Sequence, residues 1–349
     1  MFTLPESDLE EILAASEDAF ASLRGAHVFL TGGTGFVGSW MTESLLWANR
    51  RLNLRARLTL LTRDPARLAP RFAAAAEAGA LSLAAGDVRT FELDDRVDVV
   101  INAASPTTGR AADPFELADT IVGGARNVLR FAARSGNIPV LFTSSGAVYG
   151  RQPPALERIP EDYAGGPDHL DPRFAYHEAK RLAELLHVAQ GRRSGIKPKI
   201  ARLFAFVGPY LPLDAHFAIG NFVRDALRGG PVVVNGDGTP VRSYLYATDM
   251  TVCLWHILYA GNSERAYNVG SDQPISIHEA ACRTAAAAGL AIESVQVHGR
   301  AAPAGPPERY VPNVDRAQSE FGLQQTVDLD AALDRTLRFS RERLAQRLC

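Results

Sequence analysis

The sequence predicts an α/β protein built on a doubly wound parallel sheet, with a smaller lobe toward the C-terminus. Short apolar runs alternate with helix-length segments through about residue 204, and this alternation is typical of parallel strands joined by crossover helices. A glycine-spaced loop directly follows the first of these runs. The alternation loosens after about residue 205, which indicates a second, smaller lobe.

The predicted strands are six short apolar runs separated by segments long enough for helices. They cover residues 28–31, 58–62, 81–84, 97–102, 140–143 and 200–204. Before the first strand, apolar residues recur near the helical period over residues 7–23, so we expect a helix there that packs against the main domain.

Composition and charge exclude several functions. The 349 residues carry a net charge of −2 and no basic stretch, so we expect neither nucleic-acid binding nor attraction to an anionic membrane. No apolar run reaches the roughly 18 residues of a membrane span. The three cysteines are far apart and lack the spacing of a metal site, so we expect no metal and a reduced, cytoplasmic protein.

The glycine-spaced loop predicts an anion site at the start of a helix. Gly32, Gly35 and Gly38 follow the first apolar run, and a helical apolar pattern that includes Phe36 and Val37 begins beside them. Glycine allows the backbone to turn sharply and to approach a ligand, while the N–H groups of a helix's first turn attract an anion. The anion that this pattern favours is the pyrophosphate of a dinucleotide.

These features divide the chain into three predicted parts. Residues 1–24 form an N-terminal helical extension, and residues 25–204 with about 241–270 form the dinucleotide-binding domain. About 205–240 and 271–349 form the substrate lobe. The proline-rich stretches 150–172 and 301–312 are expected to be binding loops.

The segment around Tyr176 and Lys180 supplies a candidate catalytic pair. Four residues apart on a helix, the two side chains lie on the same face. A nearby positive charge favours the phenolate, and we therefore expect Lys180 to lower the pKa of Tyr176. The protein has only three lysines against 34 arginines, which makes this lysine more informative. Ser144 and Ser145, at the end of a predicted strand, are candidates to polarise a substrate oxygen.

Three motifs together resemble the extended short-chain dehydrogenase/reductase superfamily, in its nucleotide-sugar epimerase/dehydratase branch. They are TGGTGFVG at 31–38, SSGAVYG at 144–150 and YHEAK at 176–180. The resemblance runs from about residue 26 to about residue 325 and implies a Rossmann fold.

The resemblance also implies roles for individual residues. It makes Ser145 the catalytic hydroxyl, Tyr176 the acid/base and Lys180 the residue that holds the nicotinamide ribose. The implied cofactor-binding residues are Gly32, Gly35, Phe36, Val37, Gly38, Arg63, Asp87, Val88, Ala103, Ala104, Tyr176 and Lys180. The implied substrate-binding residues are Ser144, Ser145, Asn221, Arg242 and Arg309, with the two arginines on the diphosphate.

The implied cofactor is NAD(P)(H). Thr62 stands where an acidic residue would select NAD through the ribose 2′-hydroxyl, and Arg63 follows it. This slightly favours NADP, although Arg63 could instead stack on adenine and Asp64 could reach the ribose.

The implied substrate is a nucleoside diphosphate sugar that is oxidised at carbon 4. Dehydratases carry an Asp-Glu pair where Gly146 and Ala147 stand, and decarboxylases carry a Glu at 147, so both reactions are disfavoured. Glu178 and Arg181 keep decarboxylation open. We therefore expect a 4-epimerase first, then a 4-keto-sugar reductase, then a decarboxylase or dehydratase.

Three alternatives lie outside that group: a reductase of a non-nucleotide carbonyl, a non-catalytic dinucleotide sensor and a scaffold without cofactor. The resemblance also implies a homodimer, formed by the helix around Tyr176 and by residues 116–134.

Overall fold

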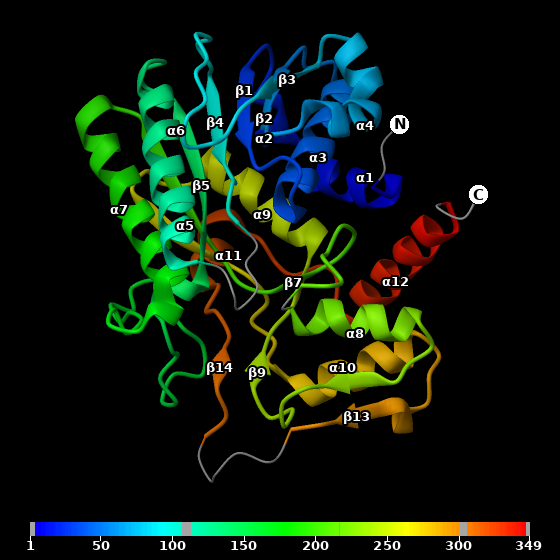
Figure 1. The fold of residues 1–349 in the computed structure, drawn as a ribbon. Coiled ribbons are helices and arrows are strands. Elements are labelled where there is room, and N and C mark those ends of the chain that lie inside the picture. The colour runs from blue at the N-terminus through cyan, green and yellow to red at the C-terminus, as the bar shows by residue number, and fades with distance from the viewer. Residues whose placement is uncertain (1–3, 107–112, 216, 300–305, 347–349) are drawn as a thin grey trace.

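A seven-stranded, fully parallel sheet forms the centre of the protein in the computed structural model, which describes residues 4–106, 113–215, 217–299 and 306–346 (Figure 1). The strand order is β11-β6-β5-β4-β1-β2-β3. The strands are β1 (His27–Thr31), β2 (Arg57–Thr62), β3 (Leu81–Ala85), β4 (Val99–Asn102), β5 (Pro139–Ser145), β6 (Lys197–Leu203) and β11 (Arg265–Val269). The predicted fold class is confirmed.

The burial of the central strand β1 explains why the apolar runs in the sequence predicted the strands. Every residue of β1 is buried, because helices cover both faces of a parallel sheet, and Val28, Phe29 and Leu30 form an apolar run at its centre. The chain runs outward from β1 through β2 and β3, and it then returns to β4 on the other side of β1. Ligands of open α/β sheets bind at such a reversal, beyond the carboxyl ends of the strands.

Helices lie on both faces of the sheet (Figure 1). The helices α3 (Phe36–Leu52), α4 (Pro65–Glu77) and α9 (Ala247–Ala260) contribute to one apolar core. On the opposite face lie α5 (Pro114–Ala118), α6 (Gly124–Ala133) and α7 (Ala175–Ser194), with a π-helical turn at Asp119–Gly123 between the first two.

The N-terminal extension is two helices rather than the single helix expected over residues 7–23. The helices α1 (Glu6–Ala15) and α2 (Glu17–Ala21) are separated at Ser16, whose φ of −133° lies outside the helical range. Both pack on α3 and α9, and their apolar residues belong to the core of the main sheet.

The smaller lobe, at the bottom of Figure 1, is built in its described residues from short strands and helices. Its helices are α8 (Ala218–Leu227), α10 (Ile277–Ala287) and α12 (Leu329–Gln346), which share a second apolar core. Its strand groups are β8 (Val232–Val234) with β13 (Val295–Val297), and β9 (Val241–Arg242) with β12 (Ile275–Ser276) and β14 (Arg309–Tyr310). The pair β7 (Phe206–Val207) and β10 (Leu245–Tyr246) lies between the two cores.

The C-terminal part of the chain does not stay within this lobe. α11 (Asp315–Phe321) packs against α9 and β11, and its Ala317 belongs to the core of the main sheet. This corrects the expectation that the whole of 271–349 belongs to the substrate lobe. Residues 315–321 lie with the large sheet because Ala317 and Phe321 supply apolar cover for its β11 edge. The rest of the division into domains stays a prediction.

Candidate active site

The glycine loop lies between the carboxyl ends of β1 and β4. Gly32 has a φ of +75°, and a Cβ there would lie 2.5 Å from the backbone carbonyl carbon of Ala103. A Cβ on Gly38 would overlap the carbonyl oxygen of Gly32. Glycine is therefore required at both positions, by backbone conformation at the first and by close packing at both.

The helix that follows the loop leaves its N-terminus open. α3 begins at Phe36, and its N-cap residue, Gly35, gives no side-chain hydrogen bond to the first turn of the helix. The N–H groups of Phe36, Val37 and Gly38 belong to the first turn, where an α-helix provides no internal partner. These groups and the dipole of a 17-residue helix suit a bound pyrophosphate, so the residues present fit a dinucleotide.

The backbone of Ala103 and Ala104, just after β4, packs against Gly32 of the glycine loop. The N–H of Ala103 donates to the carbonyl oxygen of Thr31 over 3.3 Å, and the N–H of Ala104 donates to the Thr31 hydroxyl over 3.1 Å. These bonds join the end of β4 to the end of β1 and hold the small alanine side chains at the reversal point.

The segment after β3 contains Asp87 and Val88, two of the residues expected to bind the cofactor. Asp87 accepts two bonds of 2.9 Å from the Arg89 guanidinium, which lowers the pKa of the carboxyl. Val88 packs against Gly124, where a Cβ would come within 2.9 Å of its side chain. Arg63 is exposed at the end of β2, and its charge also lowers the pKa of Asp87.

Ser144 and Ser145 end β5 with their side chains in different surroundings. The Ser145 hydroxyl accepts the N–H of Ala147 over 3.1 Å, and its interaction with Tyr176 lowers the pKa of that phenol by less than burial raises it. The Ser144 hydroxyl instead donates over 2.5 Å to Glu184 of α7 and is buried. The two side chains differ because successive side chains of a strand point to opposite faces, and the expected contact of Ser144 with substrate stays a prediction.

Tyr176 and Lys180 lie one turn apart on α7 and face the end of β5. Burial raises the pKa of Tyr176. Lys180 is 2% exposed, and its ammonium donates to the Thr143 carbonyl oxygen over 2.8 Å. Burial lowers the pKa of Lys180 to about 7.

The expectation that Lys180 lowers the pKa of Tyr176 is corrected by this geometry. The Lys180 ammonium lies 5.8 Å from the centre of the Tyr176 ring and is directed at a carbonyl oxygen instead. Burial instead raises the pKa of Tyr176.

A buried ion pair holds α7, the helix that carries Tyr176 and Lys180, against the sheet. Glu184 of α7 accepts from Arg202 of β6 over 2.7 Å, and their side chains are only 11% and 16% exposed. Arg202 also donates to the Tyr149 hydroxyl over 2.9 Å and to the Glu161 carbonyl oxygen over 3.0 Å. Because Glu184 also accepts from Ser144, one carboxylate joins α7 to both β5 and β6.

The two arginines expected on the diphosphate are not brought together. In the β9–β14 pair Arg242 is in register with Tyr310, and Arg309 is in register with Val241. Arg242 and Arg309 therefore leave opposite faces of this small sheet. Arg242 donates to Glu308 over 2.6 Å, whereas Arg309 donates to the Glu157 carbonyl oxygen over 3.3 Å, and their expected contact with a diphosphate stays a prediction.

Asn221 lies in the first part of α8, within the smaller lobe. Its side-chain oxygen accepts from Arg224 over 2.9 Å, which occupies that oxygen within the helix. Its expected contact with a nucleotide base stays a prediction.

Tyr310 was not singled out in the sequence, although it lies in the proline-rich stretch expected near the substrate. A Cβ on Gly146 would lie 2.6 Å from its hydroxyl oxygen, and its ring lies 4.6 Å from that of Phe204. In that stretch the sequence analysis considered a charged residue as the substrate contact, so it named Arg309 and not Tyr310. The strand register puts the two residues on opposite faces of β14, and it is Tyr310 that reaches Gly146.

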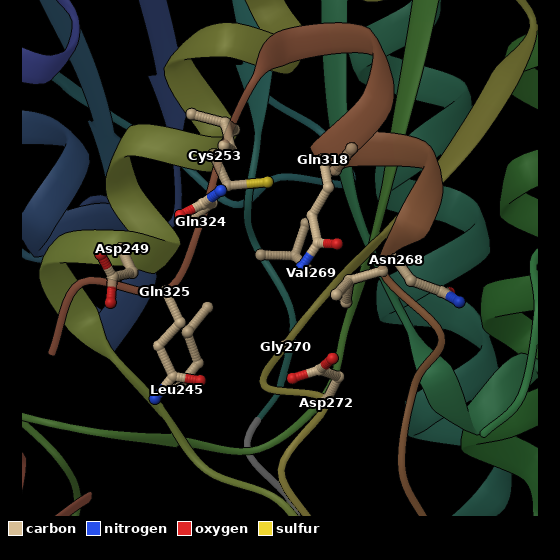
Figure 2. Close-up of a pocket in the computed structure, with 13 residues that line it drawn as sticks. Leu245, Asp249, Cys253, Asn268, Val269, Gly270, Asp272, Gln318, Gln324 and Gln325 are labelled. Atoms are coloured by element: carbon tan, nitrogen blue, oxygen red, sulfur yellow. The ribbon is translucent and has the colours of Figure 1, made fainter. Parts of the chain in front are cut away.

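A separate small cavity lies beside β11 and is drawn in Figure 2. Its volume is about 50 Å³, enough for a few water molecules but far below that of a nucleotide sugar. Asp249 and Cys253 of α9 line one side and Asn268 of β11 another. None of Ser145, Tyr176 and Lys180 lines it, so the cavity is not the expected substrate site.

The described residues contain no group of three metal-ligating side chains. In the same part of the chain, no helix has the length and apolar character needed to cross a membrane.

The doubly wound sheet, the glycine loop and the Tyr176–Lys180 helix define a Rossmann-type dinucleotide-binding enzyme of the extended short-chain dehydrogenase/reductase type. The chain belongs to the NAD dependent epimerase/dehydratase family, whose model matches residues 28–270.

Similar proteins include UDP-glucuronic acid decarboxylase 3 of Arabidopsis thaliana, which is 30% identical over 313 residues, 88% of this chain and 86% of that protein. UDP-glucuronic acid decarboxylase 1 of Xenopus tropicalis is 26% identical over 336 residues, an alignment that covers 91% of this chain and 72% of that protein. Similar solved structures include the dTDP-glucose 4,6-dehydratase DesIV of Streptomyces venezuelae with NAD and TYD bound. It is 25% identical to this chain, and the two structures superpose with a TM-score of 0.77. The match covers 92% of this chain and 98% of the DesIV chain.

Proposed function

We propose that this enzyme decarboxylates a UDP-hexuronic acid, with NAD as its bound cofactor. The supporting observation is the similarity to UDP-glucuronic acid decarboxylases along 88% of the chain, at up to 30% identity. It favours the decarboxylase, one of the alternatives left open by the sequence, over the 4-epimerase expected first.

The residues that face one another suit the opening step of this reaction. Tyr176, beside the Ser145 hydroxyl, accepts the proton of the sugar's 4-hydroxyl. A bound nicotinamide would supply the hydride acceptor and donor for carbon 4. Ser145 hydrogen-bonds the oxygen at carbon 4, and Lys180, buried next to Tyr176, holds the ribose of the cofactor.

Loss of carbon dioxide needs little more from the protein. With a ketone at carbon 4, the carboxylate on carbon 5 is that of a β-keto acid. The bond between carbons 5 and 6 breaks, its electron pair passes to the oxygen at carbon 4, and donors such as Ser145 stabilise the charge that develops there. An acid at position 146 or 147 is not required for this cleavage, so Gly146 and Ala147 do not exclude it.

A 4-epimerase is the second candidate, because Gly146 and Ala147 offer no acid or base and epimerisation needs only Ser145, Tyr176 and Lys180. A one-way 4-keto-sugar reductase uses the same three residues. The three reactions differ in their products and in the cofactor that they consume.

We expect the purified protein to convert UDP-glucuronic acid to a UDP-pentose and carbon dioxide without net consumption of cofactor. The test incubates the protein with UDP-glucuronic acid, UDP-glucose and dTDP-glucose, each with and without reduced cofactor, and identifies the products by mass and NMR. A product of unchanged mass would make the enzyme an epimerase. A gain of two hydrogens would make it a reductase, and either result overturns the decarboxylase proposal.

Titration of the same protein with NADH and NADPH decides the cofactor. The family description and the NAD bound in DesIV support NAD, whereas the exposed Arg63 at the end of β2 is the reason to consider NADP. Tighter binding of NADPH would favour the assignment that the sequence slightly preferred.

We also propose a homodimer through α5 and α7, because three large apolar side chains are exposed there. Phe115 is 83% exposed, Leu182 44% and Leu185 62%, and α5 contacts α7. Leu182 and Leu185 are three residues apart and so lie on the same face of their helix.

Replacing Leu185 with Glu is expected to convert the dimer to a monomer, because the substitution places a charge in an apolar interface. Light scattering after size-exclusion chromatography measures the mass. Ile292→Glu is the matched control, since Ile292 is 63% exposed but lies in the smaller lobe. The proposal fails if the wild-type protein is monomeric at micromolar concentration or if both variants behave alike.

A further inference from the structure

The N-terminal extension is attached to the main domain by apolar packing. Leu9 and Ile12 of α1 and Phe20 of α2 are fully buried and belong to the core of the main sheet. At the end of α1, the Ala15 carbonyl oxygen accepts from His256 of α9 over 2.8 Å. The burial of three such side chains stabilises this attachment more than one hydrogen bond does. The main domain therefore sets the position of α1.

Asp8 of α1 makes polar contacts with segments that belong to the smaller lobe or lead to it. Its side chain is only 1% exposed, and its carboxylate accepts from the Tyr246 hydroxyl over 2.7 Å and from the Arg335 guanidinium over 3.0 Å. Tyr246 ends β10, whereas Arg335 lies on α12, whose apolar residues belong to the second core. The Arg335 guanidinium also lies 5.4 Å from the centre of the Tyr246 ring. One buried carboxylate therefore joins α1 to both β10 and α12.

A hollow of about 170 Å³ lies between α1 and α12, at the right of Figure 1. It is lined by residues of both helices, among them Ser7 and Asp8 of the first and Arg335 and Phe339 of the second. Atoms on opposite sides of such a hollow are too far apart for van der Waals attraction. The polar bonds of Arg335, to Asp8 and over 2.8 Å to Glu11, therefore link the two helices across it.

A second buried carboxylate holds the chain just before α1. Glu43 of α3 is 1% exposed and accepts from the N–H of Leu4 over 2.9 Å and from the Tyr210 hydroxyl over 2.8 Å. Tyr210 follows β7 in the segment that leads to α8, and its ring centre lies 5.6 Å from that of Phe339 on α12. Its φ of +69° is uncommon for a residue other than glycine and persists only where the surroundings hold it. The start of the extension and the entry to the smaller lobe thus share one carboxylate.

We propose that the N-terminal extension, residues 4–21, is a strut that fixes the smaller lobe at one position relative to the main domain, with Asp8 as the positioning residue. This inference rests on the proposed function, in which a nucleotide sugar lies between the two lobes, but not on which sugar it is. Such a substrate binds only while the lobes are correctly placed, so its apparent affinity falls with the population of that arrangement. The cofactor site at the ends of β1 and β4 lies within the main domain, and its affinity should not depend on the strut.

Asp8→Asn keeps the size of the side chain and removes the charge that binds Arg335. We expect KM for UDP-glucuronic acid to rise about tenfold, with kcat changed less than about threefold and the Kd of NADH less than about twofold. Arg335→Gln removes the other partner, whose side chain is 26% exposed, and should have an effect of similar size. The double variant should show little further rise in KM, because both substitutions remove the same bond.

Two controls separate the strut from a general loss of stability. Glu11→Gln removes the same charge from the same arginine at a side chain 43% exposed, and because exposed pairs contribute little, KM should change less than about twofold. Phe20→Leu loosens the packing on Trp255, whose ring centre lies 4.9 Å away within the main domain. This variant should be less stable in urea and yet keep the KM of wild type.

The position of the smaller lobe can also be measured without substrate. All three tryptophans of the chain lie on α3 and α9 of the main domain. Cys282 lies partly exposed on α10 of the smaller lobe, whereas Cys253 is buried. With Cys349 replaced by Ser, an acceptor dye on Cys282 reports the distribution of distances between the lobes by time-resolved energy transfer from the tryptophans. We expect this distribution to broaden in the Asp8 and Arg335 variants and to stay as in wild type in the two controls.

The outcomes separate the two proposals. An unchanged KM or an unchanged distance distribution in both Asp8→Asn and Arg335→Gln would overturn the strut, and so would an equal rise of KM in the two controls. If the wild-type protein converts no nucleotide sugar, the proposed function fails, while the energy transfer still tests whether the extension fixes the smaller lobe.

Discussion

Replacing Tyr176 with Phe is expected to lower kcat by about 100-fold or more, because phenylalanine cannot accept the proton of the sugar hydroxyl. The ring would still pack beside Lys180, so the protein should fold and bind cofactor with little change. Steady-state turnover of the substrate found in the product panel measures the effect, and fluorescence titration with the reduced cofactor measures binding.

The control for this variant is Tyr259→Phe, which removes the hydroxyl of a tyrosine 49% exposed on α9. Turnover within a few-fold of wild type in Tyr176→Phe would remove Tyr176 from the reaction. Loss of turnover together with loss of cofactor binding would instead indicate a disturbed cofactor site.

Replacing Arg202 with Leu is expected to lower the free energy of unfolding by about 3–5 kcal/mol. The substitution leaves the Glu184 carboxylate, only 11% exposed, without its guanidinium partner, and an unpaired buried charge is strongly destabilising. It also removes the donor to the Tyr149 hydroxyl. Urea denaturation at neutral pH, followed by circular dichroism, measures the change.

Arg192→Leu is the matched control, because it breaks an ion pair of 2.9 Å with Glu264 in which the arginine side chain is 72% exposed. An exposed pair contributes at most about 1 kcal/mol, so this variant should remain close to wild type. Removing both charges in Arg202→Leu/Glu184→Met should recover much of the lost stability. Equal effects of Arg202→Leu and Arg192→Leu would show that burial does not govern the Arg202–Glu184 pair.

The large sheet could be predicted because its physical causes are local. Burial on both faces makes the middle of β1 and of its neighbours mostly apolar, and the glycines at 32 and 38 are required by contacts with nearby backbone. Tyr176 and Lys180 could be paired for a similar reason, since helical geometry alone puts residues four apart on the same face.

Other features of the site depend on how distant segments meet, which the sequence does not display. β9 and β14 contain two residues each, too few to show a period, so the opposite faces of Arg242 and Arg309 could not be anticipated. The roles of Ser144 and Ser145 depended on which face of β5 each occupies. The effect of Lys180 on Tyr176 was overestimated because the Thr143 carbonyl that binds the ammonium was unknown.

The N-terminal helix α1 has a consequence for the order in which the protein is assembled. Asp8 is 1% exposed, accepting from the Tyr246 hydroxyl over 2.7 Å and from Arg335 of α12 over 3.0 Å. Arg335 is separated from Asp8 by 327 positions along the chain. During synthesis α1 therefore lacks this partner until almost the whole chain has been made, and closing so long a loop is slow. The bond from Arg335 to Asp8 is thus among the last contacts that α1 gains.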